Sequence, residues 1–349
     1  MATIRPFERS DLPSVSRLLR ANIESWWRDD EFLSGTLLDH PWVDDELRSL
    51  VATEDGEVTG FVGAQARRMV FDDRPVRGVC VSHLAVAPGK RAGAAGALLL
   101  SRLLAGPQDL SWSDSANAAV VRMWRTFGGD VDSARASDWM IVVRPVRWVA
   151  GAARNVVRRR RVGRQEVPVG ALPAHMGRGI GEPEAEEPAL DALSEPVSIE
   201  VIAEEEPAAA RGVRLRIAHD PAYLDHVFGL IEREGVPVVR RLVRRGGRIV
   251  GWYAYLRRPD GARRVLHFSA STRDREAVFE RLVEDARADG GTVLSGRFEP
   301  GLEEPLAARM AVLGLARKPM LHTGDAEIRA VIQTESALIT QLDSEWFVT

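Results

Sequence analysis

Residues 82–100 read SHLAVAPGKRAGAAGALLL, and this stretch decides the fold. Its first part is apolar and predicts a strand, whereas its last part is rich in Ala and Leu and predicts a helix. A turn of small residues joins the two and opens directly into the helix. The first N–H groups of a helix lack intrahelical partners and the helix dipole is positive there, so the turn is suited to bind an anion such as a diphosphate.

Strands and helices alternate around this turn. Asp55-Gly56 joins two alternating segments, which is a strong signal of a β-hairpin. Ser10 or Asp11 caps a helix whose buried face carries Val15 and Leu19. The predicted strands are 4–7, 50–54, 57–68, 76–86, 109–113 and 139–144, and the predicted helices are 11–22, 93–105 and 118–127.

The glycine-rich turn resembles the acetyl-coenzyme-A signature of the GCN5-related N-acetyltransferases (GNAT), which reads Arg or Gln, two residues, Gly, one residue, then Gly or Ala. Two registers fit: Lys90 followed by Gly93 and Ala95, or Arg91 followed by Ala94 and Gly96. The resemblance extends over residues 1–147 and includes Asn117 as a helix cap. It implies an acyl-coenzyme-A site at Leu84, Ala85, Val86, Lys90, Arg91, Ala92, Gly93, Ala94, Ala95, Gly96, Ala97, Asn117 and Trp124.

The resemblance also implies acid–base chemistry. A base removes a proton from the attacking amine, and an acid returns one to the departing thiolate, beside a strand that separates from its neighbour. Trp124 occupies the position of the usual acidic Tyr, and an indole cannot act as an acid, so Ser115 is our substitute candidate. His83 is the candidate base because it titrates near neutrality, although it could equally be a structural histidine. Glu24 is the alternative base.

A compositional break separates this region from the rest of the chain. The segment begins basic, with an arginine cluster from Arg154 to Arg164, and then becomes acidic and proline-rich, which predicts a flexible linker over 148–211. The cycle of elements then repeats. The predicted strands are 213–217, 265–270 and 292–298, the predicted helices are 221–234, 275–289 and 302–313, and a hairpin over 241–256 turns at Gly246-Gly247.

The second cycle predicts a tandem, degenerate copy of the first fold, over residues 212–349. Bulky charged residues from Ser271 to Arg275 occupy the place of the small-residue turn, so we expect no second coenzyme site. Arg297, Glu299 and Glu345 either contact an acceptor between the halves or form ordinary salt bridges. The aromatic and acidic C-terminal segment is expected to dock onto a domain face.

Composition limits the other functions. A chain of 349 residues exceeds one hydrophobic core, and 45% hydrophobic with 28% charged residues is typical of a soluble globular protein. A net charge of −3 provides no field for nucleic acid or an anionic membrane. A single cysteine, Cys80, excludes an intrachain disulfide. With no signal-like start and no apolar run of about 18 residues, we expect a cytoplasmic protein.

Together these patterns predict a layered α/β protein of two GNAT-like domains, each a mixed sheet flanked by helices and joined by the linker. We expect an N-acyltransferase that moves an acetyl or other acyl group from coenzyme A to a small amine, such as an amino sugar or amino-acid derivative. Two alternatives remain open: a catalytically silent acyl-coenzyme-A-binding protein, and a tRNA-dependent aminoacyltransferase of the Fem type. The oligomeric state stays open.

Overall fold

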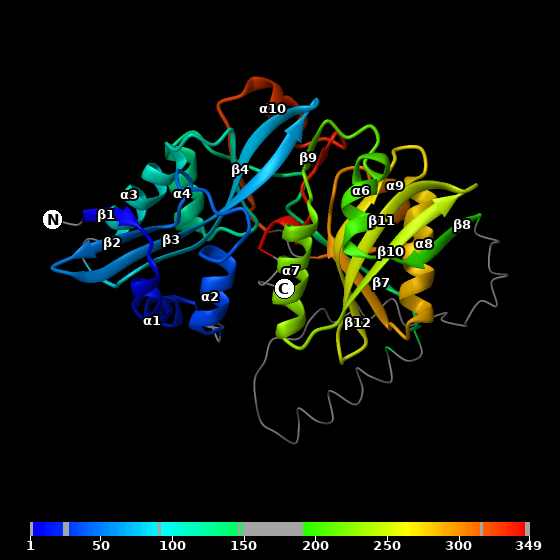
Figure 1. Cartoon of the computed structure of the whole chain (residues 1–349), viewed down its shortest axis with the longest axis horizontal. Helices are drawn as coiled ribbons and strands as arrows, with labels where there is room; N and C mark the ends of the chain where they lie inside the picture. Colours follow the sequence, from blue (N-terminus) through cyan, green and yellow to red (C-terminus); the bar gives the residue numbers. More distant parts are fainter. Residues whose placement is uncertain are drawn as a thin grey trace, which may run out of the picture.

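Two β-sheets, each flanked by helices, lie side by side in the computed structural model of the chain (Figure 1). The structure describes residues 3–23, 28–89, 92–145, 148, 191–314 and 317–345. The elements of the first part are β1 (Thr3–Pro6), η1 (Arg9–Asp11), α1 (Leu12–Asn22), α2 (Asp30–Leu37), β2 (Leu50–Glu54), β3 (Glu57–Phe71), β4 (Arg74–Val86), α3 (Ala92–Leu104), β5 (Leu110–Ser113), α4 (Ala118–Thr126), β6 (Asp130–Val131) and β7 (Asp138–Val142).

The second part follows a similar course. Its elements are β8 (Ala192–Pro196), α6 (Ile199–Ala209), β9 (Leu215–Ile217), α7 (Pro221–Arg233), β10 (Val238–Arg245), β11 (Arg248–Arg257), β12 (Ala262–Ala270), α8 (Arg275–Ala288), β13 (Val293–Arg297), α9 (Glu303–Ala308), β14 (Val312–Leu313), β15 (Met320–His322), α10 (Ala326–Val331), β16 (Ala337–Leu338) and η3 (Gln341–Asp343). No helix among the described residues is long and apolar enough to cross a membrane.

The two sheets share one local arrangement. In the first sheet, β2, β3 and β4 are antiparallel neighbours, and α3 crosses to β5, which pairs with β4 in parallel. In the second sheet, β10, β11 and β12 are antiparallel, and α8 crosses to β13, which is parallel to β12. The two predicted hairpin turns are confirmed, and positive φ angles occur at Asp55, Gly56, Gly246 and Gly247. The predicted α/β class with two mixed sheets is confirmed.

Each sheet is completed by strands from the other half of the sequence. Strand β7, expected to close the first sheet, pairs instead with β13 and β14 of the second. Its place beside β5 is taken by β15, a strand that the sequence did not predict. Strand β9, expected in the second domain, pairs with the distal end of β3. The predicted domains 1–147 and 212–349 therefore do not coincide with the two sheets.

Two further predictions require correction. Residues 192–209, assigned to the flexible linker, form β8 and α6, because Ile202 and Ala209 turn a buried face toward the core while most of the acidic residues remain outside. The arginine cluster from Arg154 to Arg164 lies outside the described residues. The predicted helix over 302–313 ends at Ala308, where Met310 takes a φ of +48° and the chain continues into β14.

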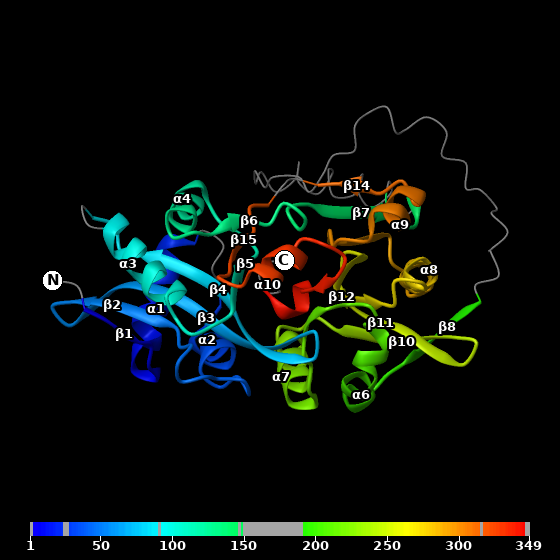
Figure 2. The ribbon, with the colours of Figure 1, turned by 90° about the horizontal axis from the view of Figure 1, so that it is seen from above.

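The C-terminal segment, defined here as residues 340–345, lies between the two sheets (Figure 2). Asp343, Ser344 and Glu345 are all at most 4% exposed, which confirms the expected docking for the described part of the C-terminus. Trp112 of β5 donates its indole N–H to the Ser344 hydroxyl at 2.9 Å. One hydrophobic cluster contains Trp112 from the first sheet, Trp252 from the second and Leu342 from this segment, so the core is continuous between the sheets.

Substitution of Gly78 tests the packing of β4 against β5. A Cβ atom at Gly78 would lie 2.8 Å from the Cζ3 atom of Trp112, a rigid ring held by Ser344. We expect Gly78→Ala to lower the free energy of unfolding, measured in urea, by about 1–3 kcal/mol. Gly229→Ala in α7 is the control, because no atom lies within 4 Å of its added Cβ and alanine favours a helix. A Gly78→Ala protein as stable as the wild type would contradict this packing.

Candidate active site

Strand β4 separates from β5 just before the glycine-rich turn. The two strands pair only from Gly78 with Leu110 to Cys80 with Trp112, while β4 continues to Val86. Residues 81–86 therefore pair with β3 on one side and with no described strand on the other. The expected separation is confirmed, and it leaves backbone donors and acceptors of β4 available to a ligand.

A β-bulge lies in this separated part of β4. The pairing with β3 shifts register at His83 and Leu84, and His83 adopts a φ of +56°. A non-glycine residue in this region costs about 1–3 kcal/mol, so the surrounding structure must hold it. The His83 Nδ1 atom lies 2.7 Å from the Ser82 hydroxyl, and Gly63 opposite leaves room for both side chains.

The surroundings of His83 bear on its predicted role as a base. Its side chain is buried, and this burial, together with the charge of Arg28, lowers the pKa of His83 to about 3. The imidazole is therefore neutral near pH 7, but a base with so low a pKa removes protons inefficiently. The structural interpretation, in which His83 supports the bulge through Ser82, is favoured. Glu24, the alternative base, lies outside the described residues.

Helix α3 follows β4 as predicted and begins at Ala92. The described side chains of its first turns, Ala94 to Ala97, are a methyl group or hydrogen, and Ala94 is exposed. Gly96 lies close to Val86, since an added Cβ would be 3.6 Å from that side chain. The described residues of these first turns therefore carry no bulky side chain of their own, which a diphosphate site at the backbone N–H groups would require. Lys90 and Arg91 lie outside the described residues.

Two further predicted cofactor residues have separate positions. Asn117 caps α4 as expected, because its Oδ1 atom accepts hydrogen bonds from the N–H groups of Ala119 and Val120 at 3.0 Å. Trp124 is only 1% exposed and belongs to a hydrophobic cluster with Leu99. A side chain with almost no free surface cannot contact a ligand, so Trp124 is a core residue rather than part of the cofactor site.

Ser115 follows the end of β5, the strand from which β4 separates. Its hydroxyl donates a hydrogen bond to the Oε2 atom of Glu345 at 3.1 Å, and the backbone N–H of Asp114 donates to the same atom at 3.1 Å. Burial raises the pKa of Glu345 to about 8, and the carboxylate of Asp114 adds to the rise. Glu345 therefore carries a proton near neutral pH and sits next to the hydroxyl that we predicted as the acid.

Buried ion pairs support the pair formed by Ser115 and Glu345. Arg297 pairs with Asp114 at 2.5 Å and with Glu299 at 2.8 Å, and Arg135 contacts Glu299 at 2.9 Å and Asp132 at 3.0 Å. The salt-bridge interpretation of Arg297 and Glu299 is thereby confirmed. Asp114 and Arg135 were not predicted as part of the site, because Asp114 lies 183 positions from Arg297 and Arg135 lies 164 positions from Glu299.

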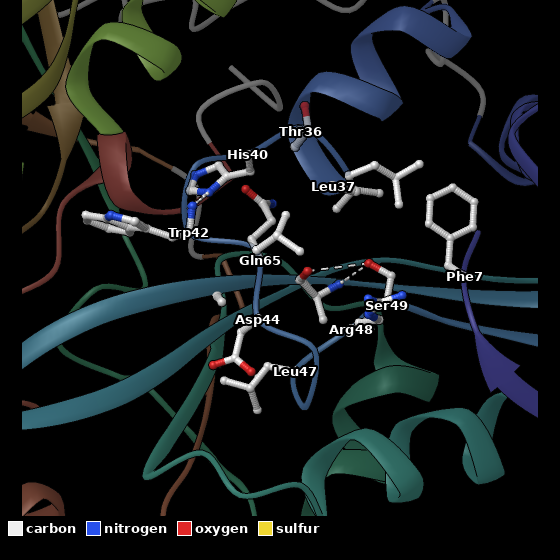
Figure 3. Close-up of a pocket in the computed structure, with 14 residues that line it drawn as sticks. Phe7, Thr36, Leu37, His40, Trp42, Asp44, Leu47, Arg48, Ser49 and Gln65 are labelled. Carbon is white, nitrogen blue, oxygen red and sulfur yellow. Dashed lines mark hydrogen bonds between the residues drawn. The ribbon is translucent and has the colours of Figure 1, made fainter. Parts of the chain in front are cut away.

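A cavity of about 120 Å³ lies between α2 and the β2–β3 hairpin (Figure 3). His40 Nδ1 accepts the backbone N–H of Trp42 at 3.0 Å, so the neutral ring carries its proton on Nε2, which has no described hydrogen-bond partner. Gln65 connects the cavity to the bulge, because its Nε2 lies 3.5 Å from the Ser82 hydroxyl. The lining residues are Phe7, Thr36, Leu37, Leu38, His40, Trp42, Val43, Asp44, Leu47, Arg48, Ser49, Ala64, Gln65 and Ala66.

Comparison with known proteins places the fold. No family model and no curated protein matches the chain. Among solved structures, it is similar to a probable N-acyltransferase from Enterococcus faecalis, with 13% identity, a TM-score of 0.60 and coverage of 93% of this chain and 73% of that one. A GCN5-related N-acetyltransferase from Anabaena variabilis is also similar, with 12% identity, a TM-score of 0.63 and coverage of 96% of this chain and 75% of that one. Eis1 from Mycobacterium abscessus has 15% identity to the chain and a TM-score of 0.56, and the match covers 96% of this chain and 76% of that one. The chain therefore has the fold of the GCN5-related N-acetyltransferases.

The raised pKa of Glu345 predicts a specific pH dependence of stability. The folded pKa is higher than the unfolded one, so stability from this group is full below about pH 4.5 and is lost as the pH rises to about 8. The loss has an upper bound of about 1.4 kcal/mol per pH unit. Urea unfolding at several pH values should show this slope in the wild type relative to Glu345→Gln. Exposed Glu303→Gln is the control, and an equal slope in all three proteins would exclude a buried, protonated Glu345.

Proposed function

We propose that the protein is an N-acyltransferase that moves an acetyl or other acyl group from coenzyme A to the amine of a small molecule. One observation carries this proposal: the unpaired edge of β4 over residues 81–86 leads into the small-residue start of α3, and β5, the strand from which it separates, leads into Ser115 and its contact with Glu345. The GNAT fold of the structural neighbours supports it.

The cofactor role follows from the donors available. Acyl-coenzyme A supplies a thioester whose carbonyl carbon is open to attack by an amine. Backbone N–H groups at the start of α3, between Arg91 and Ala97, are proposed to hold the diphosphate. The free edge of Leu84 to Val86 is proposed to position the chain that carries the thioester and to donate to the developing negative charge. Lys90 or Arg91 would add a positive charge beside the phosphates.

Ser115 and Glu345 are proposed to return the proton to the sulfur. For this step the serine hydroxyl turns its proton away from Glu345 and toward the sulfur. Glu345, protonated on Oε2, turns its own O–H toward the serine oxygen 3.1 Å away, replaces the transferred proton and is left as a carboxylate. An acid with a pKa near 8 stays protonated at physiological pH and releases its proton readily, which suits this step. The amine must lose its own proton first, to His83, Glu24 or water.

The second sheet is proposed to be a degenerate copy that helps to form the acceptor site. Its order of strands and helices supports a common layout with the first sheet. After β12, however, Asp274 and Arg275 begin α8, and the Arg275 side chain bonds to Glu335 at 2.6 Å. This turn offers no small-residue approach to the helix start. The acceptor is proposed to be a small amine, such as an amino sugar or amino-acid derivative, and the protein is proposed to act in the cytoplasm without a membrane or nucleic-acid partner.

A silent acyl-coenzyme-A-binding protein is the second candidate, favoured by the burial of Trp124 where the family has its acidic Tyr. Calorimetric titration with acetyl-coenzyme A, followed by a thiol-release assay over a panel of amines, separates the two. We expect binding and turnover. Binding without turnover would favour the silent protein, and absence of binding would exclude both. A steep loss of activity with salt would instead favour tRNA as a substrate.

Substitution of Ser115 tests the proton donor. We expect Ser115→Ala to lower kcat by about 10- to 100-fold while the affinity for acetyl-coenzyme A changes little, because the hydroxyl acts after binding. Wild-type kcat should fall above about pH 8, where Glu345 loses its proton, and this decline should disappear in Ser115→Ala. Ser133→Ala, whose hydroxyl bonds to Gln333, is the control. Unchanged kcat and an unchanged pH profile in Ser115→Ala would exclude the role.

A further inference from the structure

Two histidines and two carboxylates meet in the core between the sheets. His219 precedes α7, His267 lies on β12, Asp343 belongs to the C-terminal segment and Glu206 lies on α6. His219 Nε2 contacts Asp343 Oδ1 at 2.7 Å, and His219 Nδ1 lies 3.7 Å from Glu206 Oε2. One possible ligand atom from each of His219, His267 and Asp343 lies within 4.8 Å of the other two.

The hydrogen bonds fix the proton on His267. Thr340 donates its only hydroxyl proton to Asp343 Oδ2 at 2.7 Å, so its oxygen must accept from His267 Nδ1, which lies 3.0 Å away. His267 Nε2 is then left as an unprotonated lone pair. Among the described residues this atom has no hydrogen-bond partner, and neither do His219 Nδ1 and Glu206 Oε1. His267 is fully buried, so a polar atom without a partner is costly there.

The charges in this cluster are also incomplete. The His219 ring lies between two buried carboxylates, with Nε2 2.7 Å from Asp343 Oδ1 and Nδ1 3.7 Å from Glu206 Oε2. Even when protonated, this ring offers one positive charge to two carboxylates. Arg67 donates to the backbone oxygen of Asp343 and to Gln65, and to neither carboxylate of the cluster. Neither carboxylate of the cluster therefore has a hydrogen bond from a guanidinium among the described residues.

We propose that His219, His267 and Asp343 bind a zinc ion, with Glu206 beside them as a further carboxylate. Two imidazoles and a carboxylate are ligands that Zn²⁺ prefers, and the ion would replace the proton between His219 and Asp343 and supply positive charge to the buried carboxylates. Zinc holds such ligands at about 2.0–2.2 Å, so tetrahedral ligand atoms lie roughly 3.3–3.6 Å from one another. The His219 Nε2 and Asp343 Oδ1 atoms, now 2.7 Å apart, would therefore move apart slightly to admit the ion, and the His267 ring would move toward them. Thr340 then orients the His267 ligand from the second nitrogen.

The ion would have a structural role. Its ligands come from the turn after β9, from β12 and from the C-terminal segment, so it would tie the two sheets to the segment that carries Glu345. The cluster is buried and lies apart from the proposed coenzyme site at α3. The zinc proposal is argued from this cluster alone and does not rest on the acyl-transfer proposal.

The test is the zinc content and thermal stability of the full chain without a histidine tag. We expect elemental analysis to find one zinc per chain after purification in zinc-containing buffer, and a chelator to remove the zinc and lower the Tm. His267→Gln and Asp343→Asn should lose the zinc and its effect on Tm, while His322→Gln on β15, which is not a member of the cluster, should retain both.

Cobalt substitution keeps the test decisive if the variants fail to fold. Co²⁺ in the wild-type chain should give the visible absorption of a four-coordinate nitrogen and oxygen site, and Zn²⁺ should abolish it. Because Trp252 stacks on His267 with ring centroids 3.8 Å apart, bound Co²⁺ should also quench tryptophan fluorescence. Absence of stoichiometric zinc and of these cobalt signals, or equal zinc content in His267→Gln, Asp343→Asn and the wild type, would overturn the proposal.

Discussion

The fold depends on the burial of two carboxylates, Asp343 and Glu345, in the C-terminal segment between the sheets. An isolated charge at such depth is strongly unfavourable, so each carboxyl group needs its own solution. Asp343 is paired with His219, whereas Glu345 keeps its proton and is held by Ser115 and the backbone of Asp114. These contacts join residues separated by more than 100 positions in the chain and place both sheets against one segment. The candidate active site is a product of that placement.

Several features could be predicted from local sequence because the physics that produces them is local. The Asp55-Gly56 turn needs positive φ angles, Asn117 caps the helix that follows it, and the small residues after β4 start a helix. The position of β7 could not be predicted in this way. Alternating burial identifies a strand, but it does not identify the partner strand. The partner of β7 is β13, where Gly296 has no side chain and leaves a flat surface against which the Trp139 ring packs.

In the candidate site, too, some features could be predicted from the sequence and others depend on contacts between distant residues. The separation of β4 from β5 and the neighbourhood of Ser115 follow from the resemblance to a known pattern. The contact between Ser115 and Glu345, in contrast, joins residues 230 positions apart in the chain. Trp124 was expected near the cofactor because of its sequence position, but packing against the sheet made it a core residue. The acidic run from Glu204 to Glu206 suggested a linker, yet Glu206 accepts the indole N–H of Trp252 in the core. Charge composition alone does not predict which charged side chain finds a partner in the core.

The pairing of β15 with β5 has a consequence for synthesis on the ribosome. Strand β5 emerges about 200 residues before β15, and chain growth at roughly 5–20 residues per second separates them by some 10–40 seconds. During that interval one edge of the first sheet carries unsatisfied backbone N–H and C=O groups, an arrangement that favours pairing with other chains. The nascent protein is therefore expected to need protection by chaperones until its last residues have left the exit tunnel.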